Sequence, residues 1–132
     1  MTHFRISEAA RLIGVSDDTI RRWAADGRLE SSTDESGRQV VSGASLAHLA
    51  VELAPQSSDD ETVVSSARNR FTGIVTGVQK DSLMGKVEMQ CGPNRVVSLM
   101  SAEAVEELGI VVGSRATAVI KATMVIIETD KH

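Results

Sequence analysis

The sequence predicts an α+β protein made of two small domains, a mainly helical N-terminal domain followed by a five-stranded β-barrel. Three observations lead to this prediction. Apolar residues recur at helical spacing up to residue 54, they alternate as in strands beyond residue 65, and a polar, acidic segment separates the two patterns. With 132 residues in all, neither domain has room for a deep, multi-layered core.

The predicted boundaries are residues 1–54 for the helical domain, 55–65 for a linker and 66–132 for the barrel. The linker carries three acidic residues and no basic residue. Residues 54–62 are almost free of large apolar side chains, so burial cannot offset the entropy of ordering them. The helical domain has six basic and eight acidic residues, and the barrel has eight basic and seven acidic residues.

Composition excludes several classes of function. The net charge is −4, which gives no support to nonspecific attraction of the whole chain to nucleic acid or to an acidic membrane. A single cysteine, Cys91, excludes an internal disulfide framework and a CxxC motif. The three histidines are scattered at positions 3, 48 and 132, so no transition-metal site is expected.

No catalytic arrangement stands out either. The sequence shows no glycine-rich phosphate loop, no Ser/His/Asp order and no setting for paired carboxylates, so we expect no enzymatic activity. No run approaches the ~18 apolar residues of a membrane span, and the N-terminus lacks an apolar signal core. We therefore expect a cytoplasmic protein without a membrane partner.

The N-terminal domain is predicted to begin with two short helices joined by a glycine turn. Ser7 is expected to cap the first helix and Gly14 to end it, with Ala9, Ala10 and Ile13 on its apolar face. Ser16 is expected to cap the second helix, Asp17 to about Ala25. Its buried face holds Ile20, Trp23 and Ala24. This is a helix-turn-helix, in which the second helix enters the major groove of DNA.

A small hairpin and a third helix are predicted to complete this domain. Gly37 and Arg38 precede the apolar run Gln39 to Val41, which predicts a hairpin or wing with Arg38 at its tip. Ser45 is expected to cap the third helix. Its apolar face would consist of Leu46, Leu49, Ala50 and Leu53.

The strings Ile6 to Ser16, Thr19 to Trp23 and Gly27 to Leu29 resemble the MerR-type and excisionase-type winged helix-turn-helix. The resemblance implies double-stranded DNA as a partner. The predicted DNA-binding residues are Ser16, Asp18, Thr19, Arg21, Arg22 and Arg38. A solvated helix face is the alternative, since Asp17 and Asp18 suit a helix N-terminus but would repel phosphate.

The C-terminal domain is predicted to be an OB-like barrel with one short helix. The helix is Ala102–Leu108, capped by Ser101 and ended by Gly109. Val, Ile and Thr are frequent in the strands, and turn residues separate them. The five predicted strands are Phe71–Gln79, Leu83–Cys91, Arg95–Ser101, Arg115–Ala122 and Met124–Glu128.

Four strings in this domain resemble the molybdate-binding Mop module of the TOBE class: Ser66 to Asn69, Gly73 to Val75, Val105 to Gly109 and Ala118 to Thr123. The resemblance covers residues 65–129. It implies molybdate or tungstate as the ligand and no organic cofactor. It also implies an anion site between two copies of the module, and hence a homo-oligomer, either a dimer or a trimer of dimers.

A tetrahedral dianion must be surrounded by hydrogen-bond donors, because burying it unpaired is costly. Arg68 and Lys121 could supply two positive charges, and nearby serines could supply hydroxyl groups. The site residues that the resemblance implies are Ser66, Arg68, Ser98, Ser101, Lys121 and Ala122, the last through its backbone. Each has a simpler alternative: Ser101 as a helix cap, Ser98 as an ordinary strand residue, Lys121 as an edge-strand charge, and Arg68 as a partner of Glu128 or Asp130.

Together these features predict a molybdate- or tungstate-responsive, DNA-binding transcriptional regulator. One alternative is an oxyanion storage or buffering protein whose helical domain mediates assembly or protein interaction. Another is a DNA-architectural factor whose barrel serves only to oligomerise it. No metal is expected apart from the bound oxyanion.

Overall fold

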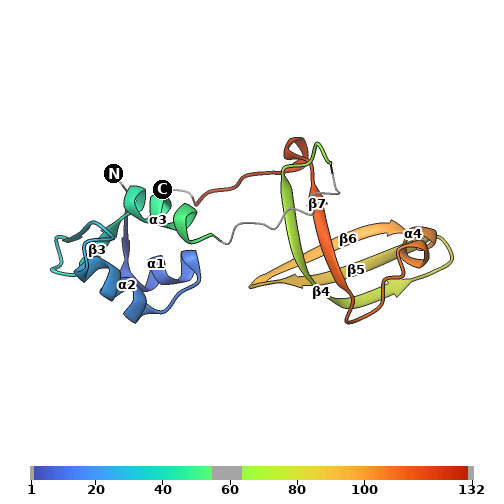
Figure 1. Ribbon diagram of the computed structural model, residues 1–132, viewed down its shortest axis with the longest axis horizontal. Helices are drawn as coiled ribbons and strands as arrows, with labels where there is room; N and C mark the ends of the chain where they lie inside the picture. Colours follow the sequence, from blue (N-terminus) through green and yellow to red (C-terminus); the bar gives the residue numbers. More distant parts are fainter. Residues whose placement is uncertain (1, 55–63, 131–132) are drawn as a thin grey trace. The chain divides into compact units, whose positions relative to one another are not determined.

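A computed structural model describes residues 2–54 and 64–130. The chain divides into two compact units, shown in Figure 1, one on either side of residues 55–63. The predicted linker, residues 55–65, lies outside the described residues except for its last two positions. None of the helices in the described part of the chain is long and apolar enough to cross a membrane.

Three helices form most of the N-terminal unit: α1 (Ile6–Ile13), α2 (Asp17–Ala25) and α3 (Gly43–Leu53). Gly14 adopts φ 74° after α1, as the glycine turn requires. The Ser16 hydroxyl oxygen accepts a hydrogen bond from the Thr19 backbone N–H at 3.2 Å, so the predicted cap of α2 is confirmed.

Two of the predicted caps are wrong. The first helix begins at Ile6, and its N-cap residue is Arg5, whose backbone N–H donates to the Glu8 carboxylate at 3.4 Å. Ser7 therefore lies inside the helix. The third helix is capped by Ser42, whose hydroxyl oxygen accepts from the Ser45 backbone N–H. Ser42 takes this role because the preceding strand leads directly into the helix and leaves Ser42 as its last extended residue.

A small antiparallel sheet with strand order β1-β3-β2 packs with these helices. Its strands are β1 (His3–Arg5), β2 (Ser31–Thr33) and β3 (Gln39–Ser42). The expected hairpin is present as β2 and β3, and Gly37 in its turn has φ 80°. Three residues are too few to show an alternating pattern, which is why β1 was not predicted.

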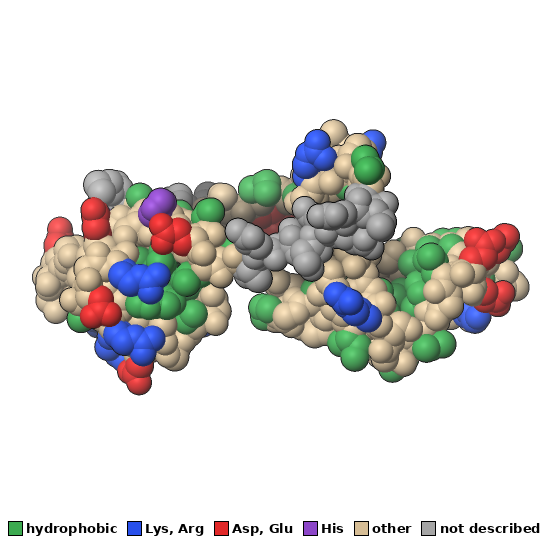
Figure 2. Space-filling model, in the orientation of Figure 1, with side chains coloured by type: hydrophobic (Ala, Val, Ile, Leu, Met, Phe, Trp, Pro, Cys, Tyr) green, Lys and Arg blue, Asp and Glu red, His purple; other side chains and the backbone are tan. Residues whose placement is uncertain are grey.

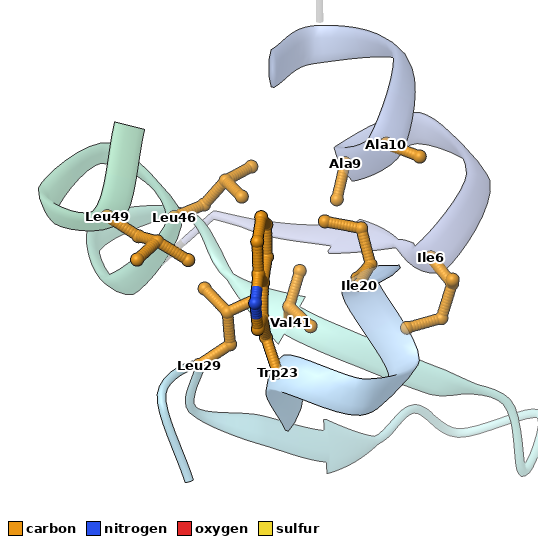
Figure 3. Packing of buried hydrophobic residues seen from close by; sticks show 9 residues of the cluster. All are labelled: Ile6, Ala9, Ala10, Ile20, Trp23, Leu29, Val41, Leu46 and Leu49. Carbon is orange, nitrogen blue, oxygen red and sulfur yellow. The ribbon is translucent and has the colours of Figure 1, made fainter. Parts of the chain in front are cut away.

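The core of this unit surrounds the single tryptophan. Figure 3 shows the Trp23 ring at the centre of the cluster, with leucines of α3 on one side and Ile20 and Val41 on the other. Leu46 and Leu49 are buried as predicted, whereas Leu53 is 41% exposed because it lies in the last turn of α3. The core thus holds α2 against α1 on either side of the Gly14 turn.

The C-terminal unit is one curled antiparallel sheet with strand order β6-β5-β4-β7, visible in Figure 1. A short helix, α4 (Ala102–Glu107), follows β6 and is capped by Ser101, as predicted. The pairing of β4 with β5 shifts register between Val75 and Gly77, where an irregularity bends the long first strand. The strands are β4 (Asn69–Lys80), β5 (Met84–Cys91), β6 (Asn94–Ser101) and β7 (Arg115–Ile120).

The predicted fifth strand, Met124–Glu128, does not form. A 3₁₀ turn, η1 (Ala122–Met124), follows β7, and Val125 to Asp130 have no regular structure. The last pair between β4 and β7 is Asn69 with Ile120. Because β4 begins at Asn69, the chain beyond Ile120 has no strand beside it to continue the ladder. Within residues 64–130 the sheet therefore has four strands and does not close into a barrel.

One face of this sheet carries the core, with Val75, Val87, Met89 and Cys91 packed under Val105 of α4. Gly73 lies close against the backbone at the end of β5. A Cβ atom there would collide with the Gln90 carbonyl oxygen and lie 2.8 Å from the Cys91 Sγ atom. The absence of a side chain at Gly73 is thus part of the packing.

Gly73→Ala should destabilise the C-terminal unit by about 1–3 kcal/mol, because backbone atoms of β5 must shift to admit the methyl group. Urea unfolding followed by circular dichroism measures this change. Fluorescence of Trp23 serves as an internal control for the other unit. Gly77→Ala is the matched variant, since its Cβ would meet nothing closer than 3.7 Å. Equal midpoints for the two variants would contradict the packing account.

Candidate functional sites

The exposed face of α2 begins with a hydroxyl pair. The side-chain oxygens of Ser16 and Thr19 lie 2.8 Å apart and share a hydrogen bond. Within α2, the Asp18 carboxylate accepts a hydrogen bond from the Arg21 guanidinium at 3.1 Å. Four of the six predicted DNA-binding residues therefore lie in α2 and Ser16 caps it, although Asp18 partly neutralises Arg21.

Arg22 and Arg38 complete the predicted set. Both are exposed, and neither forms an ion pair among residues 2–54 and 64–130. Arg38 follows Gly37 in the turn between β2 and β3. On the face seen in Figure 2, basic and acidic side chains of this unit are interspersed and do not form a patch of one sign. Any contact with phosphate must then come from individual arginines.

Sequence reasoning missed Arg28 as a candidate. Its guanidinium lies over the Trp23 ring, 5.4 Å from the ring centroid. Gly27, with φ 79°, turns the chain after α2, and Leu29 is buried beside Trp23. Gly27-Arg28-Leu29 is one of the strings that resemble the MerR-type pattern. The string itself does not indicate that Arg28 stacks on Trp23.

The segment before β4 is folded tightly around Arg68. Its guanidinium donates to the backbone carbonyls of Ser66, at 3.2 Å, and of Ser65, at 3.4 Å. The Ala67 backbone N–H donates to the Ser65 hydroxyl oxygen at 3.1 Å. No ion pair joins Arg68 to Glu128 or Asp130 in the described part of the chain. The positive charge of Arg68 is thus not neutralised by a carboxylate there.

Asn69 links this segment to the end of β7. Its side-chain amide donates to the Ile120 carbonyl at 3.2 Å, across the last pair of the β4–β7 ladder. One residue beyond that pair, Arg68 and Lys121 leave the ladder at the same end of the sheet. Lys121 and Ala122 are exposed and begin the η1 turn. Figure 2 shows Lys and Arg side chains together at this end of the unit.

Ser98 and Ser101 lie elsewhere in the sheet. Both belong to β6, which is separated from β7 by two intervening strands. Ser101 pairs with Met84 of β5, and the neighbouring Gly85 pairs with Lys80, at the opposite end of β4 from Asn69. The Ser101 hydroxyl oxygen accepts a hydrogen bond from the Ala104 backbone N–H at 3.1 Å. The structure therefore brings together Ser66, Arg68, Lys121 and Ala122, but places the two serines of β6 away from them.

A charged cluster on β5 and β6 is already paired. The Glu88 carboxylate accepts from Arg95 at 2.6 Å and from Lys86 at 3.2 Å. The Arg95 guanidinium, followed by Lys86, lowers the pKa of the Glu88 carboxyl below its ordinary value. Within the described residues, no group of three His, Cys, Asp or Glu side chains is arranged to hold a metal ion.

Comparison with known proteins bears on both units. The TOBE domain model matches residues 65–127, and the model of the MerR family regulatory protein matches residues 5–40. Molybdenum-pterin-binding protein 1 of Clostridium pasteurianum is 43% identical over 63 residues, which are 47% of this chain and 93% of that protein. A probable molybdenum-pterin-binding protein of Haemophilus influenzae is 40% identical over 66 residues, 49% of this chain and 96% of that protein.

The C-terminal unit thus matches a TOBE domain and has molybdenum-pterin-binding proteins among its relatives, and the chain belongs to the TOBE-domain family. Among solved structures, MopII of Clostridium pasteurianum is 39% identical, with a TM-score of 0.47. That match covers 50% of this chain and 100% of MopII. The molybdate-binding protein ModG is 35% identical, with a TM-score of 0.45, and the match covers 49% of this chain and 47% of ModG.

Glu88→Gln should lower stability at neutral pH and should matter less in acid. Because the folded-state pKa of Glu88 is lowered, its ion pairs stabilise the fold fully above the unfolded glutamate pKa of about 4.3, and this contribution is lost as pH falls through the lower folded-state pKa. The urea midpoints of variant and wild type should therefore converge below about pH 4. Glu107→Gln is the control, because Glu107 forms no ion pair among the described residues. A difference in urea midpoint between Glu88→Gln and wild type that does not change with pH would contradict the pairing.

Proposed function

We propose that this chain is a molybdate- or tungstate-responsive DNA-binding transcriptional regulator that acts in the cytoplasm. The C-terminal unit binds the oxyanion and the N-terminal unit binds double-stranded DNA. The observation that carries the proposal is the register of Asn69 with Ile120, which brings the cationic residues Arg68 and Lys121 to one end of a TOBE-type sheet. The chain binds and responds; no catalytic step is assigned to it.

The oxyanion is held by charge and by hydroxyl groups. Arg68 and Lys121 match the two charges of the dianion, while the Ser66 hydroxyl and the Ala122 backbone N–H donate further hydrogen bonds. Ser98 and Ser101 lie too far along the sheet to join this group in the same chain. We therefore assign them to the other half of the site, contributed by a second copy. No organic cofactor takes part.

Exposed apolar side chains support assembly of two or more copies. Beyond β7, Met124 is 73% exposed, Ile126 85% and Ile127 81%. In β6, at one edge of the sheet, Leu99 is 71% exposed. Contiguous exposed apolar groups beside unpaired strand edges mark an interaction surface. A homo-oligomer, either a dimer or a trimer of dimers, would cover them and complete the anion site.

DNA is bound by α2 in the major groove, with the β2–β3 hairpin at the backbone. Arg22 and Arg38 have no carboxylate partner among residues 2–54, so both are available to phosphate or base edges. The matched MerR family model spans residues 5–40, which include α2, β2 and the beginning of β3. The N-terminal unit is net acidic, so tight binding to DNA requires two N-terminal units held on one oligomer. The oxyanion would change DNA binding by favouring one arrangement of that oligomer.

Storage or buffering of the oxyanion is the second candidate function. The match to the Clostridium pasteurianum relative spans 93% of that protein but only 47% of this chain. That relative therefore leaves about half of this chain without a counterpart. An oxyanion-binding module can thus exist without a DNA-reading domain, and the helical unit would then mediate assembly or protein interaction.

Arg68→Ala and Lys121→Ala should each weaken molybdate binding by about 10- to 100-fold, because each removes a charge-assisted hydrogen bond. Isothermal titration with molybdate, tungstate and sulfate measures the effect. Arg115→Ala is the control, since Arg115 lies at the other end of β7. Unchanged molybdate binding by the Arg68 and Lys121 variants would refute the assigned site, and no binding by the wild type would refute both proposed functions.

Arg22→Ala should weaken binding to duplex DNA by about three- to tenfold through the loss of one phosphate contact. Fluorescence anisotropy with a labelled duplex detects the loss, and Arg11→Ala, at an exposed residue in the last turn of α1, is the control. Molybdate binding should stay unchanged in both variants. A wild-type chain that binds molybdate but no DNA would favour storage over regulation.

A further inference from the structure

The loop between β2 and β3 is organised by one side chain. The Asp34 carboxylate oxygen Oδ1 accepts hydrogen bonds from the backbone N–H groups of Ser36 and Arg38, both at 2.9 Å. The Asp34 backbone adds two more, donating to the Arg38 carbonyl at 2.9 Å and accepting from the Gly37 N–H at 3.0 Å. Every residue from Ser36 to Arg38 is thus tied to Asp34.

This arrangement holds the backbone of Arg38, from which the exposed side chain extends, in a defined place. Gly37 supplies the left-handed conformation, φ 80°, that lets the chain reverse within the loop. Asp34 is half-buried, whereas Glu35, Ser36 and Arg38 are exposed. Without the carboxylate, the two N–H groups would turn to water and the loop would sample several conformations. The guanidinium of Arg38 would then be spread over many positions.

Charge alone predicts that Asp34 weakens the binding of DNA. A carboxylate four residues from a phosphate-contacting arginine repels DNA, and the N-terminal unit is already net acidic. The backbone N–H of Arg38, more than any other group, lowers the pKa of the Asp34 carboxyl, so the group is ionised at neutral pH. Its electrostatic effect on DNA is unfavourable, and its effect on loop geometry is favourable.

We propose that Asp34 is a positioning residue for DNA binding, whose hydrogen bonds to the loop present Arg38 to the phosphate backbone. This inference rests on the proposed function, because it assigns Asp34 a role in the same DNA contact. The geometric effect outweighs the repulsion, since a fixed arginine loses less conformational entropy on contact than a mobile one.

The test compares Asp34→Ala with Asp34→Asn in binding a fluorescently labelled, mixed-sequence duplex of about three helical turns at about 50 mM salt. Asp34→Ala should weaken binding about three- to tenfold, as Arg38→Ala does. Asp34→Asn should bind at least as tightly as the wild type, because its amide oxygen keeps the loop bonds while the negative charge is gone. Glu35→Ala is the control: it removes a neighbouring charge without a loop bond and should not weaken binding.

Two further readouts separate positioning from charge and from general loss of structure. Asp34→Ala should lower the slope of log affinity against log salt by about 0.9, as Arg38→Ala does, because one phosphate contact is lost. In the Arg38→Ala background, Asp34→Ala should have no additional effect. Trp23 fluorescence on urea unfolding confirms that the variants remain folded.

The outcomes are distinguishable. Tighter DNA binding by Asp34→Ala, or additive effects of the two substitutions, would overturn the positioning role while leaving the DNA-binding proposal intact. If the wild-type chain binds no duplex under these conditions, the proposed function fails and the role of Asp34 fails with it. If Arg38→Ala leaves the affinity for the duplex unchanged, Arg38 makes no phosphate contact, and the positioning role of Asp34 is refuted.

Discussion

The pairing of β4 with β7 is the constraint on which the candidate oxyanion site depends. Six consecutive pairs, from Asn69 with Ile120 to Ile74 with Arg115, fix the two strands in register. The Asn69 side chain adds a bond to the Ile120 carbonyl, so the ladder ends at a defined point. Residues that are more than 50 positions apart in sequence then leave the sheet together. A slip of one residue would turn every side chain to the other face and separate Arg68 from Lys121.

The same register leaves apolar side chains of this unit exposed. The ladder ends where β4 begins, so the segment after Ile120 keeps its apolar side chains exposed and the sheet stays open at both edges. Ser98 and Ser101 lie on the far strand. The proposed assembly, which would cover these apolar side chains and complete the anion site, is thus an expected consequence of this topology. In the N-terminal unit, the packing of Trp23 has the corresponding role, because it fixes α2 relative to α1 and the hairpin.

The features predictable from sequence were those set by local chemistry. Gly14 ends α1, Ser16 caps α2 and Ser101 caps α4, because each of these residues acts through backbone groups within three or four positions. The errors came from strands, whose extent depends on pairing with distant parts of the chain. Ser42 replaced Ser45 as a cap because β3 leads straight into α3, and Met124–Glu128 failed to form a strand although its composition favours one, because no neighbour is available in the chain. Likewise, the resemblance identified the candidate anion residues, but only the topology shows that they fall into two separated groups.

The central claim, that two copies share one oxyanion site, is tested most directly by mixing variants. Arg68→Ala and Ser98→Ala each damage one half of the site, so neither homo-oligomer should bind molybdate well. A symmetric pair forms two such sites, and in a mixed pair one site has both halves damaged while the other has both halves intact. Unfolding and reassembling the two variants together, followed by titration with molybdate, should therefore restore binding at wild-type affinity in a fraction of the sites. A mixture that binds no better than the average of the two separate variants would contradict a shared site.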